Sequence, residues 1–281
     1  MNREFILIIL TVLFLVITLV NRTYDETLNN ETMGEYEMEY EIHGDPDKEI
    51  IIFIHGIGAS SWMWWQQLDA FDDYQICLVD LPGHGKNADI PWIDLTTTTQ
   101  MIAEDVIGNQ RAHIVGISLG GHVALEIAKH YPQKVKSTFI SGITVKPMPF
   151  KFLMPIQSRL VQRSLSNTDY LYRLAKENYH LPENKIEEFI RNYQLLTREN
   201  YEAIGYEIMD FRLDESYAVI KHPIVFVAGD QESSGILKSL KVAPKIIRGA
   251  VTAEILNAQH IWPVQMPKEF NQILKEWVSK N

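Results

Sequence analysis

The sequence is poor in cysteine and in positive charge. Cys77 is the single cysteine among 281 residues, so an internal disulfide and a cysteine-based metal cluster are both excluded. Cys77 lies in an apolar run, and we interpret it as a buried small hydrophobic residue. The formal net charge of −10 disfavours binding to nucleic-acid phosphates, because like charges repel. We therefore expect no nucleic-acid partner and no metal site.

Long apolar runs are also scarce, and the one at the N-terminus has nearly the length of a membrane span. Residues 5–20 are all apolar apart from two threonines. As a helix they would extend about 24 Å, slightly less than a hydrocarbon core of about 30 Å. The run is longer than a usual signal-peptide core, and no A-x-A-like site follows it. We predict that residues 1–22 are an uncleaved membrane anchor or, alternatively, a cleaved signal segment, and that residues 23–34 are a polar linker.

The charges that flank this segment favour an orientation in which the N-terminus lies on the cytoplasmic side of the membrane and the main domain on the other side. The sequence therefore predicts a single-pass membrane protein that contacts the membrane through residues 5–20, with an extracytoplasmic domain. The alternative is a protein secreted after signal cleavage. The sequence does not indicate an oligomeric state.

The remainder, residues 35–281, alternates between strand and helix patterns. Residues 35–42 alternate apolar and polar side chains, which is typical of an exposed or edge strand. Continuous apolar runs predict buried strands at residues 49–54, 74–79, 112–116, 137–140 and 224–228, with a further strand at 252–256. Helical patterns cover residues 62–71, 96–107, 119–130, 234–240 and 267–280. Repeated strand–helix units predict an α/β fold, with a mostly parallel central sheet and helices on both faces.

This alternation stops between about residues 144 and 218, where the sequence is helical in character and lacks buried strand runs. We predict a helical cap insertion over one end of the sheet, above the nucleophile identified below. Its apolar side chains Met148, Phe150, Phe152, Leu153 and Met154 either face a substrate pocket or pack within the cap.

A candidate nucleophile lies between a predicted strand and a predicted helix. Gly116-Ile117-Ser118-Leu119-Gly120 has the pattern G-x-S-x-G. A serine on such a sharp turn has strained backbone angles, and small residues two positions to either side avoid a clash. The turn exposes the Ser118 hydroxyl and directs the helix N-terminus towards it.

A candidate general base and its orienting acid follow later in the chain. His260 comes after the predicted strand 252–256, at the carboxyl edge of the sheet where active sites form. The loop after residues 224–228 contains Asp230 and Glu232. Either carboxylate can accept the imidazole N–H of His260, so both remain candidates at this point.

The loop after the first buried strand has the sequence His55-Gly56-Ile57-Gly58. Glycine allows its backbone to come close to a substrate. We predict that the backbone N–H groups of Ile57 and Leu119 form an oxyanion hole.

These motifs together resemble the α/β-hydrolase superfamily, in its large subgroup with a helical cap. The resemblance covers about residues 35–281. It implies that Asp80, in the turn Asp80-x-x-Gly83-x-Gly85, is structural, and that the acid lies three residues after the glycine that ends its strand. That position is Glu232, and Asp230 is the alternative. The resemblance also implies that Trp62 and Trp64 line the pocket, although packing against the sheet is the alternative for both rings.

The expected reaction is acyl transfer to water without a cofactor, on a small and apolar acyl substrate. A carboxylic ester is the default substrate. A thioester, a lactone or a carbon–carbon bond in a diketone are alternatives for the same triad of Ser118, acid and His260. Haloalkane dehalogenases and most epoxide hydrolases resemble this fold but carry aspartate at the nucleophile position, which disfavours both activities here. A catalytically silent ligand-binding protein is the non-enzyme alternative.

Overall fold

A computed structural model describes residues 36–281 of the chain. The chain divides into a unit of residues 1–37 and a unit of residues 38–281, and the fold given below is that of the second unit. The predicted linker, residues 23–34, lies outside the described residues.

The predicted membrane localisation requires correction. The segment on which it rested, residues 5–20, lies outside the described residues. Within residues 36–281, no helix is long and apolar enough to cross a bilayer. The prediction of a single-pass membrane protein is therefore wrong. The run of 16 apolar or threonine residues is also shorter than the roughly 20 that a span requires.

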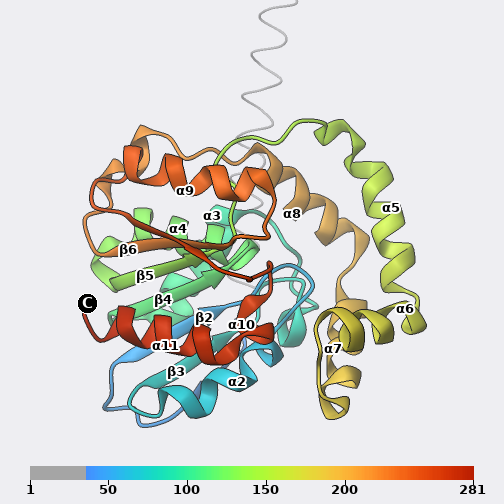
Figure 1. Cartoon of the computed structure of the whole chain (residues 1–281), viewed down its shortest axis with the longest axis horizontal. Coiled ribbons are helices and arrows are strands. Elements are labelled where there is room, and N and C mark those ends of the chain that lie inside the picture. Colours follow the sequence, from blue (N-terminus) through green and yellow to red (C-terminus); the bar gives the residue numbers. More distant parts are fainter. Residues whose placement is uncertain (1–35) are drawn as a thin grey trace, which may run out of the picture. The chain divides into compact units, whose positions relative to one another are not determined.

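Seven strands form a single, mostly parallel sheet (Figure 1). Its strand order is β1-β3-β2-β4-β5-β6-β7, and only β1 runs antiparallel to its neighbour. The strands are β1 (Tyr40–His43), β2 (Ile50–Ile54), β3 (Gln75–Val79), β4 (Ala112–Ile117), β5 (Val135–Ser141), β6 (Ile224–Gly229) and β7 (Val251–Ile255). Every residue of β2, β3, β4 and β6 is buried, as their continuous apolar runs predict.

Helices cover both faces of this sheet. Successive strand residues point to opposite faces: on β5, Phe139 contacts Phe270 of α11, whereas Ile140 packs near Gly121 of α4. The helices outside the cap are α2 (Trp65–Leu68), α3 (Leu95–Met101), α4 (Leu119–His130), α9 (Ser234–Ile246), α10 (Trp262–Gln265) and α11 (Pro267–Val278). Shorter turns of helix lie at Ser61–Trp64, Asp69–Phe71, Gly85–Asn87, Pro132–Lys134 and Glu215–Val219, and a π-helix at Ile102–Ile107 continues α3. The predicted α/β architecture is confirmed.

Four helices lie between β5 and β6, where the sequence predicts the cap. They are α5 (Met154–Leu165), α6 (Thr168–Arg173), α7 (Glu183–Leu195) and α8 (Arg198–Asp210), with short helices at Lys151–Leu153 and Leu174–Asn178. Figure 1 shows α5 at the outer edge of this group, with α8 between it and the sheet. The boundaries at about residues 144 and 218 stay a prediction.

Helix α8 is the part of the cap that is bonded to the loop before α3. The Asn200 side-chain oxygen accepts a hydrogen bond from the Trp92 backbone N–H at 3.0 Å. The Glu207 carboxylate accepts from the Trp92 indole at 3.1 Å and from the Leu95 backbone N–H at 2.7 Å. Helix α5 in turn bonds to α8, through Gln157 and Tyr201 and through Ser158 and Glu202. Within the described residues, the side-chain hydrogen bonds from α5 to other elements therefore run to α8.

Candidate active site

Ser118 lies on a sharp turn between β4 and α4. Its φ of 55° and ψ of −118° are rare for a residue with a side chain. The backbone N–H of Ser118 donates to the Ser141 carbonyl at 2.8 Å, which fixes the turn against the end of β5. As the G-x-S-x-G pattern indicates, the strand before Ser118 and the helix after it hold this serine at the carboxyl edge of the sheet.

The two glycines of the motif are required by close backbone contacts. A Cβ atom on Gly116 would overlap the Gly120 carbonyl, and one on Gly120 would overlap the Ile54 carbonyl of β2. The Gly120 N–H also donates to the His55 carbonyl at 3.0 Å. The helix that follows Ser118 thus begins directly on the neighbouring strand, and larger side chains would displace it.

His260 is paired with Glu232. Its Nδ1 atom lies 3.0 and 2.9 Å from the two carboxylate oxygens. The Glu232 side chain is 4% exposed and the His260 side chain 41% exposed. A buried carboxylate at Nδ1 orients the ring so that its other nitrogen, Nε2, is available at the open side.

Asp230, the alternative acid, lies elsewhere in the same loop. Its backbone N–H donates to the Ile255 carbonyl at 3.0 Å. Its buried Oδ1 atom has no hydrogen-bond partner within the described part of the chain. The structure therefore brings Glu232, and not Asp230, to His260.

Gly142, directly after β5, makes space for the His260–Glu232 pair, and it is not among the residues predicted from the sequence. A Cβ atom at this position would lie 3.0 Å from Glu232 Oε1 and 3.0 Å from both Cε1 and Nδ1 of His260. Its φ of +66° also favours glycine. A glycine immediately after a buried strand was the available signal.

We expect Gly142→Ala to lower kcat by about a hundredfold, because the new methyl group displaces the imidazole by a fraction of an ångström or more. KM for the same substrate should change much less, because neither chamber described below includes Gly142. Steady-state kinetics of the folded variant test this. A variant with unchanged kcat would show that the pair tolerates the added group.

Two backbone N–H groups lie beside Ser118 without an acceptor. Ile57 and Leu119 both line the space next to the serine. Within residues 36–281, neither N–H donates to a protein carbonyl in a turn or cap, and Leu119 is the first residue of α4, where the helix itself offers none. These are the donors that the sequence predicts for an oxyanion hole.

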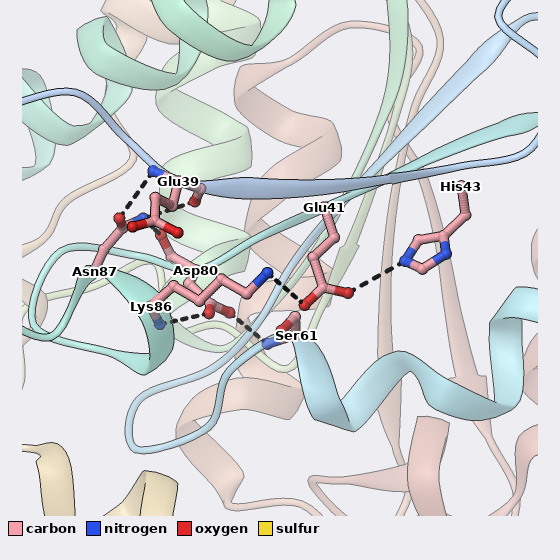
Figure 2. A network of polar contacts seen from close by, with 7 residues as sticks. All are labelled: Glu39, Glu41, His43, Ser61, Asp80, Lys86 and Asn87. Atoms are coloured by element: carbon pink, nitrogen blue, oxygen red, sulfur yellow. Dashed lines mark hydrogen bonds and ion pairs between the residues drawn. The ribbon is translucent and has the colours of Figure 1, made fainter.

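Asp80 lies in a network of polar contacts with Ser61, Lys86 and Asn87 (Figure 2). Its carboxylate accepts from the backbone N–H of Ser61 at 2.6 Å and of Lys86 at 2.8 Å, and its carbonyl accepts from Asn87 at 2.6 Å. Asn87 also bonds the backbone of Glu39, just before β1. Asp80 therefore bonds backbone amides and not a histidine, as the family resemblance implies.

Three buried histidines surround the nucleophile turn. Burial lowers the pKa of His55 to about 4 and that of His122 to about 4, and burial together with the nearby His55 lowers the pKa of His84 to about 3. His55 Nε2 accepts a hydrogen bond from the Leu81 N–H at 2.9 Å, which requires that nitrogen to be unprotonated. All three rings are therefore neutral near pH 7.

We expect these histidines to make the fold acid-labile. Their folded-state pKa values lie below the unfolded value of about 6.5, so stability is present above that pH and is lost as pH falls towards 4. Each ring should contribute a few kcal/mol to this loss, against a total of about 5–15 kcal/mol. Glu207, whose pKa burial raises to about 7, acts in the opposite sense and offsets part of it.

Urea unfolding between pH 8 and pH 4.5 measures this effect. The free energy of unfolding should fall steeply below about pH 6. A His84→Gln variant should show a shallower slope, and a flat profile for the natural sequence would contradict the expectation.

Two cavities of about 260 Å³ each meet at Ser118 and Ile57. We call one the methionine chamber; its lining residues are Ile57, Ser118, Leu119, Met148, Met154, Gln157, Tyr201, Ile204, Gly205, Ile208 and Met209. We call the other the histidine chamber; its lining residues are Gly56, Ile57, Ala59, Met63, Ile117, Ser118, Tyr179, Tyr193, His260 and Ile261. Ser118 and His260 thus face one space, although no hydrogen bond joins their side chains within the described residues. Such contacts often tighten only when substrate binds.

Neither chamber is lined by a lysine, arginine, aspartate or glutamate. The polar groups of the histidine chamber, besides Ser118 and His260, are the hydroxyls of Tyr179 and Tyr193, which lie 3.1 Å apart. Burial raises the pKa of both, so both are neutral. The space around the serine is therefore uncharged while His260 is neutral.

Trp62 and Trp64 do not line either chamber, so their placement matches the alternative that was given for both rings, which is packing. Trp64 is fully buried, with its ring centroid 5.0 Å from that of Phe53. Trp62 contacts Phe189 edge to face at 5.5 Å. The residue between them, Met63, lines the histidine chamber instead. Both tryptophans pack in the core, because the short helix turns their side chains away from the site.

No group of three histidine, cysteine or acidic side chains within residues 36–281 is arranged to hold a metal ion.

Known proteins resemble this chain in sequence. The sequence model of the Alpha/beta hydrolase family matches residues 51–273. An AB hydrolase superfamily protein of Gibberella zeae is 34% identical over 48% of this chain and 49% of its own length. A 2-hydroxy-6-oxononadienedioate/2-hydroxy-6-oxononatrienedioate hydrolase of Paraburkholderia phymatum is 31% identical over 70% of this chain and 63% of its own length. The matched part of the chain thus spans about half of the length of the first relative and less than two thirds of the length of the second.

Solved structures share the fold at low identity. An alpha/beta hydrolase enzyme from a Medee basin deep-sea metagenome library has a TM-score of 0.72 at 18% identity, covering 87% of this chain and 94% of its own. The enol-lactonase of Burkholderia xenovorans LB400 has a TM-score of 0.69 at 17% identity, and the match covers 86% of this chain and 96% of the enol-lactonase chain. These likenesses show the fold, and the family model that matches residues 51–273 shows that the chain belongs to the Alpha/beta hydrolase family.

Proposed function

We propose that the protein is a serine hydrolase that cleaves a neutral carboxylic ester with an apolar acyl group. The observation that carries this proposal is the junction of two uncharged chambers at Ser118, with the His260–Glu232 pair at one of them. A base that a buried carboxylate orients beside a serine supports nucleophilic catalysis.

In the proposed mechanism, His260 takes the Ser118 proton as the hydroxyl oxygen attacks the ester carbonyl. The N–H groups of Ile57 and Leu119 stabilise the oxyanion, and Glu232 stabilises the imidazolium. The protonated His260 then gives its proton to the departing alcohol as the ester carbon–oxygen bond breaks. Water, deprotonated by His260, attacks the acyl-enzyme, and the proton returns to Ser118 as the acid product leaves.

This mechanism sets the orientation of the substrate. The leaving alcohol must be within reach of His260, so it occupies the histidine chamber. The acyl chain then occupies the methionine chamber, which His260 does not line. Two separate spaces favour an open-chain ester over a lactone, in which the alcohol remains attached to the acyl chain. Each is smaller than the roughly 300–1,000 Å³ typical of whole ligand pockets, as expected for one arm of a substrate.

The absence of charge favours an ester over the substrate class named for the Paraburkholderia phymatum relative. That protein is named for dioates, which carry two carboxylates. Buried carboxylates require a cationic or hydrogen-bonding partner, and no lysine or arginine lines either chamber. A neutral substrate fits this lining better.

A matched substrate panel tests the proposal. We expect the enzyme to hydrolyse p-nitrophenyl esters of neutral fatty acids, and to hydrolyse poorly both the half-esters of dicarboxylic acids of equal length and a dioate diketone. Faster turnover of the dioate, with no ester hydrolysis, would instead support carbon–carbon hydrolysis. No turnover of any substrate and no labelling by a fluorophosphonate would support the silent binding protein.

The length of the accepted acyl chain should depend on Met154. Its side chain lies so close to α8 that a Cβ atom on Gly205 would overlap its terminal methyl. Met154→Ala removes this part of the chamber wall, so kcat/KM should shift by about tenfold or more towards longer acyl chains, as expected for space for added methylenes. Ile261→Ala, in the histidine chamber, is the matched control and should alter the preference for the alcohol instead. If Met154→Ala altered the preference for the alcohol and Ile261→Ala altered the preference for the acyl chain, the proposed orientation of the substrate would be reversed.

A further inference from the structure

The outer side of the cap carries an exposed apolar surface. Its members, which we call the α5 ridge, are Phe150, Phe152, Leu153, Ile156 and Leu160, with exposed fractions of 65, 72, 43, 58 and 62%. They extend from the turn before α5 into the helix itself. Large apolar side chains exposed singly are ordinary, but a contiguous group of this kind indicates an interaction surface.

Two sets of neighbouring side chains make up this segment. Leu153, Ile156 and Leu160 are spaced by three and four residues and so share a helix face. The rings of Phe150 and Phe152 contact each other edge to face, 6.1 Å apart. Phe150 also has a φ of 67°, which residues other than glycine rarely adopt. Burial does not compensate this strain, because the ring is largely exposed.

The same helix also contributes to the wall of the methionine chamber. Met154, which is 3% exposed, and Gln157 both line the methionine chamber. Helix α5 therefore separates this chamber from the exposed ridge. Within the described residues, its side-chain hydrogen bonds to other elements run to α8.

Basic residues flank the ridge in a chain that is acidic overall. Residues 146–168 contain four basic side chains and no acidic one, against a net charge of −10 for the whole chain. The four are Lys146, Lys151, Arg159 and Arg163. From α8, Asp210 pairs with Lys151, and Glu202, which bonds Arg198 and Ser158, lies near Arg159. The segment itself keeps a positive excess beside its apolar face.

We infer that the α5 ridge is a docking surface for an anionic lipid bilayer. An amphipathic helix with aromatic and aliphatic side chains on one face and lysine or arginine beside them lies in the plane of such a surface. Phe150 and Phe152 enter the headgroup region, and the basic side chains contact anionic headgroups. The contact is peripheral and involves no membrane-spanning helix. A second copy of the chain fits less well, because two ridges face to face would bring like charges together.

A fluorescent label at the ridge tests this in the full-length protein. Phe152→Cys provides the labelling site, because Cys77 is fully buried and burial raises its pKa to about 12. A site-specific label is needed because residues 5–20 are also apolar, so total binding to vesicles would not identify the surface. With an environment-sensitive dye at residue 152, we expect phosphatidylglycerol vesicles to shift the emission to shorter wavelength and to protect the dye from aqueous quenchers.

The matched control is a dye at Val251→Cys. Val251 is 50% exposed and begins β7, at the sheet edge opposite to the serine. It should show neither effect. Arg159→Gln and Arg163→Gln should each weaken the response at residue 152 by about fivefold, as expected for one charge near an anionic surface.

Three results would overturn the inference. They are an unchanged dye at residue 152 with phosphatidylglycerol, an equal response to phosphatidylcholine, and a response that grows with protein concentration without vesicles, which would indicate self-association. Leu160→Cys provides a second reporter on the same ridge. None of these readings depends on ester hydrolysis.

Discussion

Replacing Ser118 with alanine lowers kcat for ester hydrolysis by about 10⁴- to 10⁶-fold and abolishes covalent labelling by a fluorophosphonate. This is the largest effect we expect from a single substitution. Within residues 36–281, Ser118 is the one side-chain hydroxyl that lines both chambers, and it lies next to the N–H groups of Ile57 and Leu119, which have no protein acceptor there. Without its oxygen no acyl-enzyme forms, and the remaining site only binds and polarises the substrate.

The control for this result separates chemistry from folding. Alanine at φ 55° is no more strained than serine, so Ser118→Ala should keep its circular dichroism spectrum and unfolding transition. Ser279→Ala, near the C-terminal end of α11 and away from the site, should be labelled and active like the natural sequence. Wild-type turnover or labelling in Ser118→Ala would exclude the proposed mechanism.

Replacing Glu232 with glutamine should lower kcat by about 10⁴-fold, by analogy with the orienting acid of serine proteases. Both carboxylate oxygens lie within 3.0 Å of His260 Nδ1. An amide there has an oxygen on one side only and cannot stabilise the imidazolium as an anion does. The imidazole then loses both the orientation and the protonation state that the reaction requires.

Asp230→Asn is the paired experiment, because this acid lies in the same loop but does not contact His260. We expect its turnover to remain close to that of the natural sequence. Both variants should be checked for a native unfolding transition before they are assayed. A large loss in Asp230→Asn with near-normal turnover in Glu232→Gln would reverse the assignment of the acid.

The sheet and the nucleophile turn are predictable from sequence because their causes are local. The apolar runs of β2 and β3 are strands buried on both faces, and the glycines around Ser118 are required by contacts within a few residues along the chain or on the adjacent strand. The pairing of His260 with Glu232 agrees with the position that family resemblance implies. Its catalytic role stays a prediction until the substitutions are made.

Side-chain direction was harder to predict, since it depends on how distant elements pack. Met148 and Met154 line a chamber, but Phe150 and Phe152, from the same apolar run, are exposed. All four residues are large and apolar, so composition does not distinguish them. The turn before α5 directs the two methionines to the chamber and the two phenylalanines to the surface. Neither of the two expected alternatives, a pocket face or internal packing, describes the whole run.

The end of helix α9 also could not be predicted from the sequence of the segment alone. The pattern predicts a helix over residues 234–240, whereas the helix continues to Ile246 with Pro244 inside it. Proline removes one backbone donor and disfavours a helix interior. Burial of Leu240 and Ala243 against the sheet domain outweighs this cost. Tertiary packing of this kind is not visible in the sequence of the segment.

The backbone of Ser118 also has an evolutionary consequence. A residue with a side chain at a φ of 55° destabilises the native state by about 1–3 kcal/mol, a sizeable part of a total of about 5–15 kcal/mol. Glycine at the same position would relieve this strain and remove the nucleophile. Selection for a more stable protein and selection for turnover therefore oppose each other at this residue, and retention of serine leaves the fold less tolerant of destabilising substitutions elsewhere.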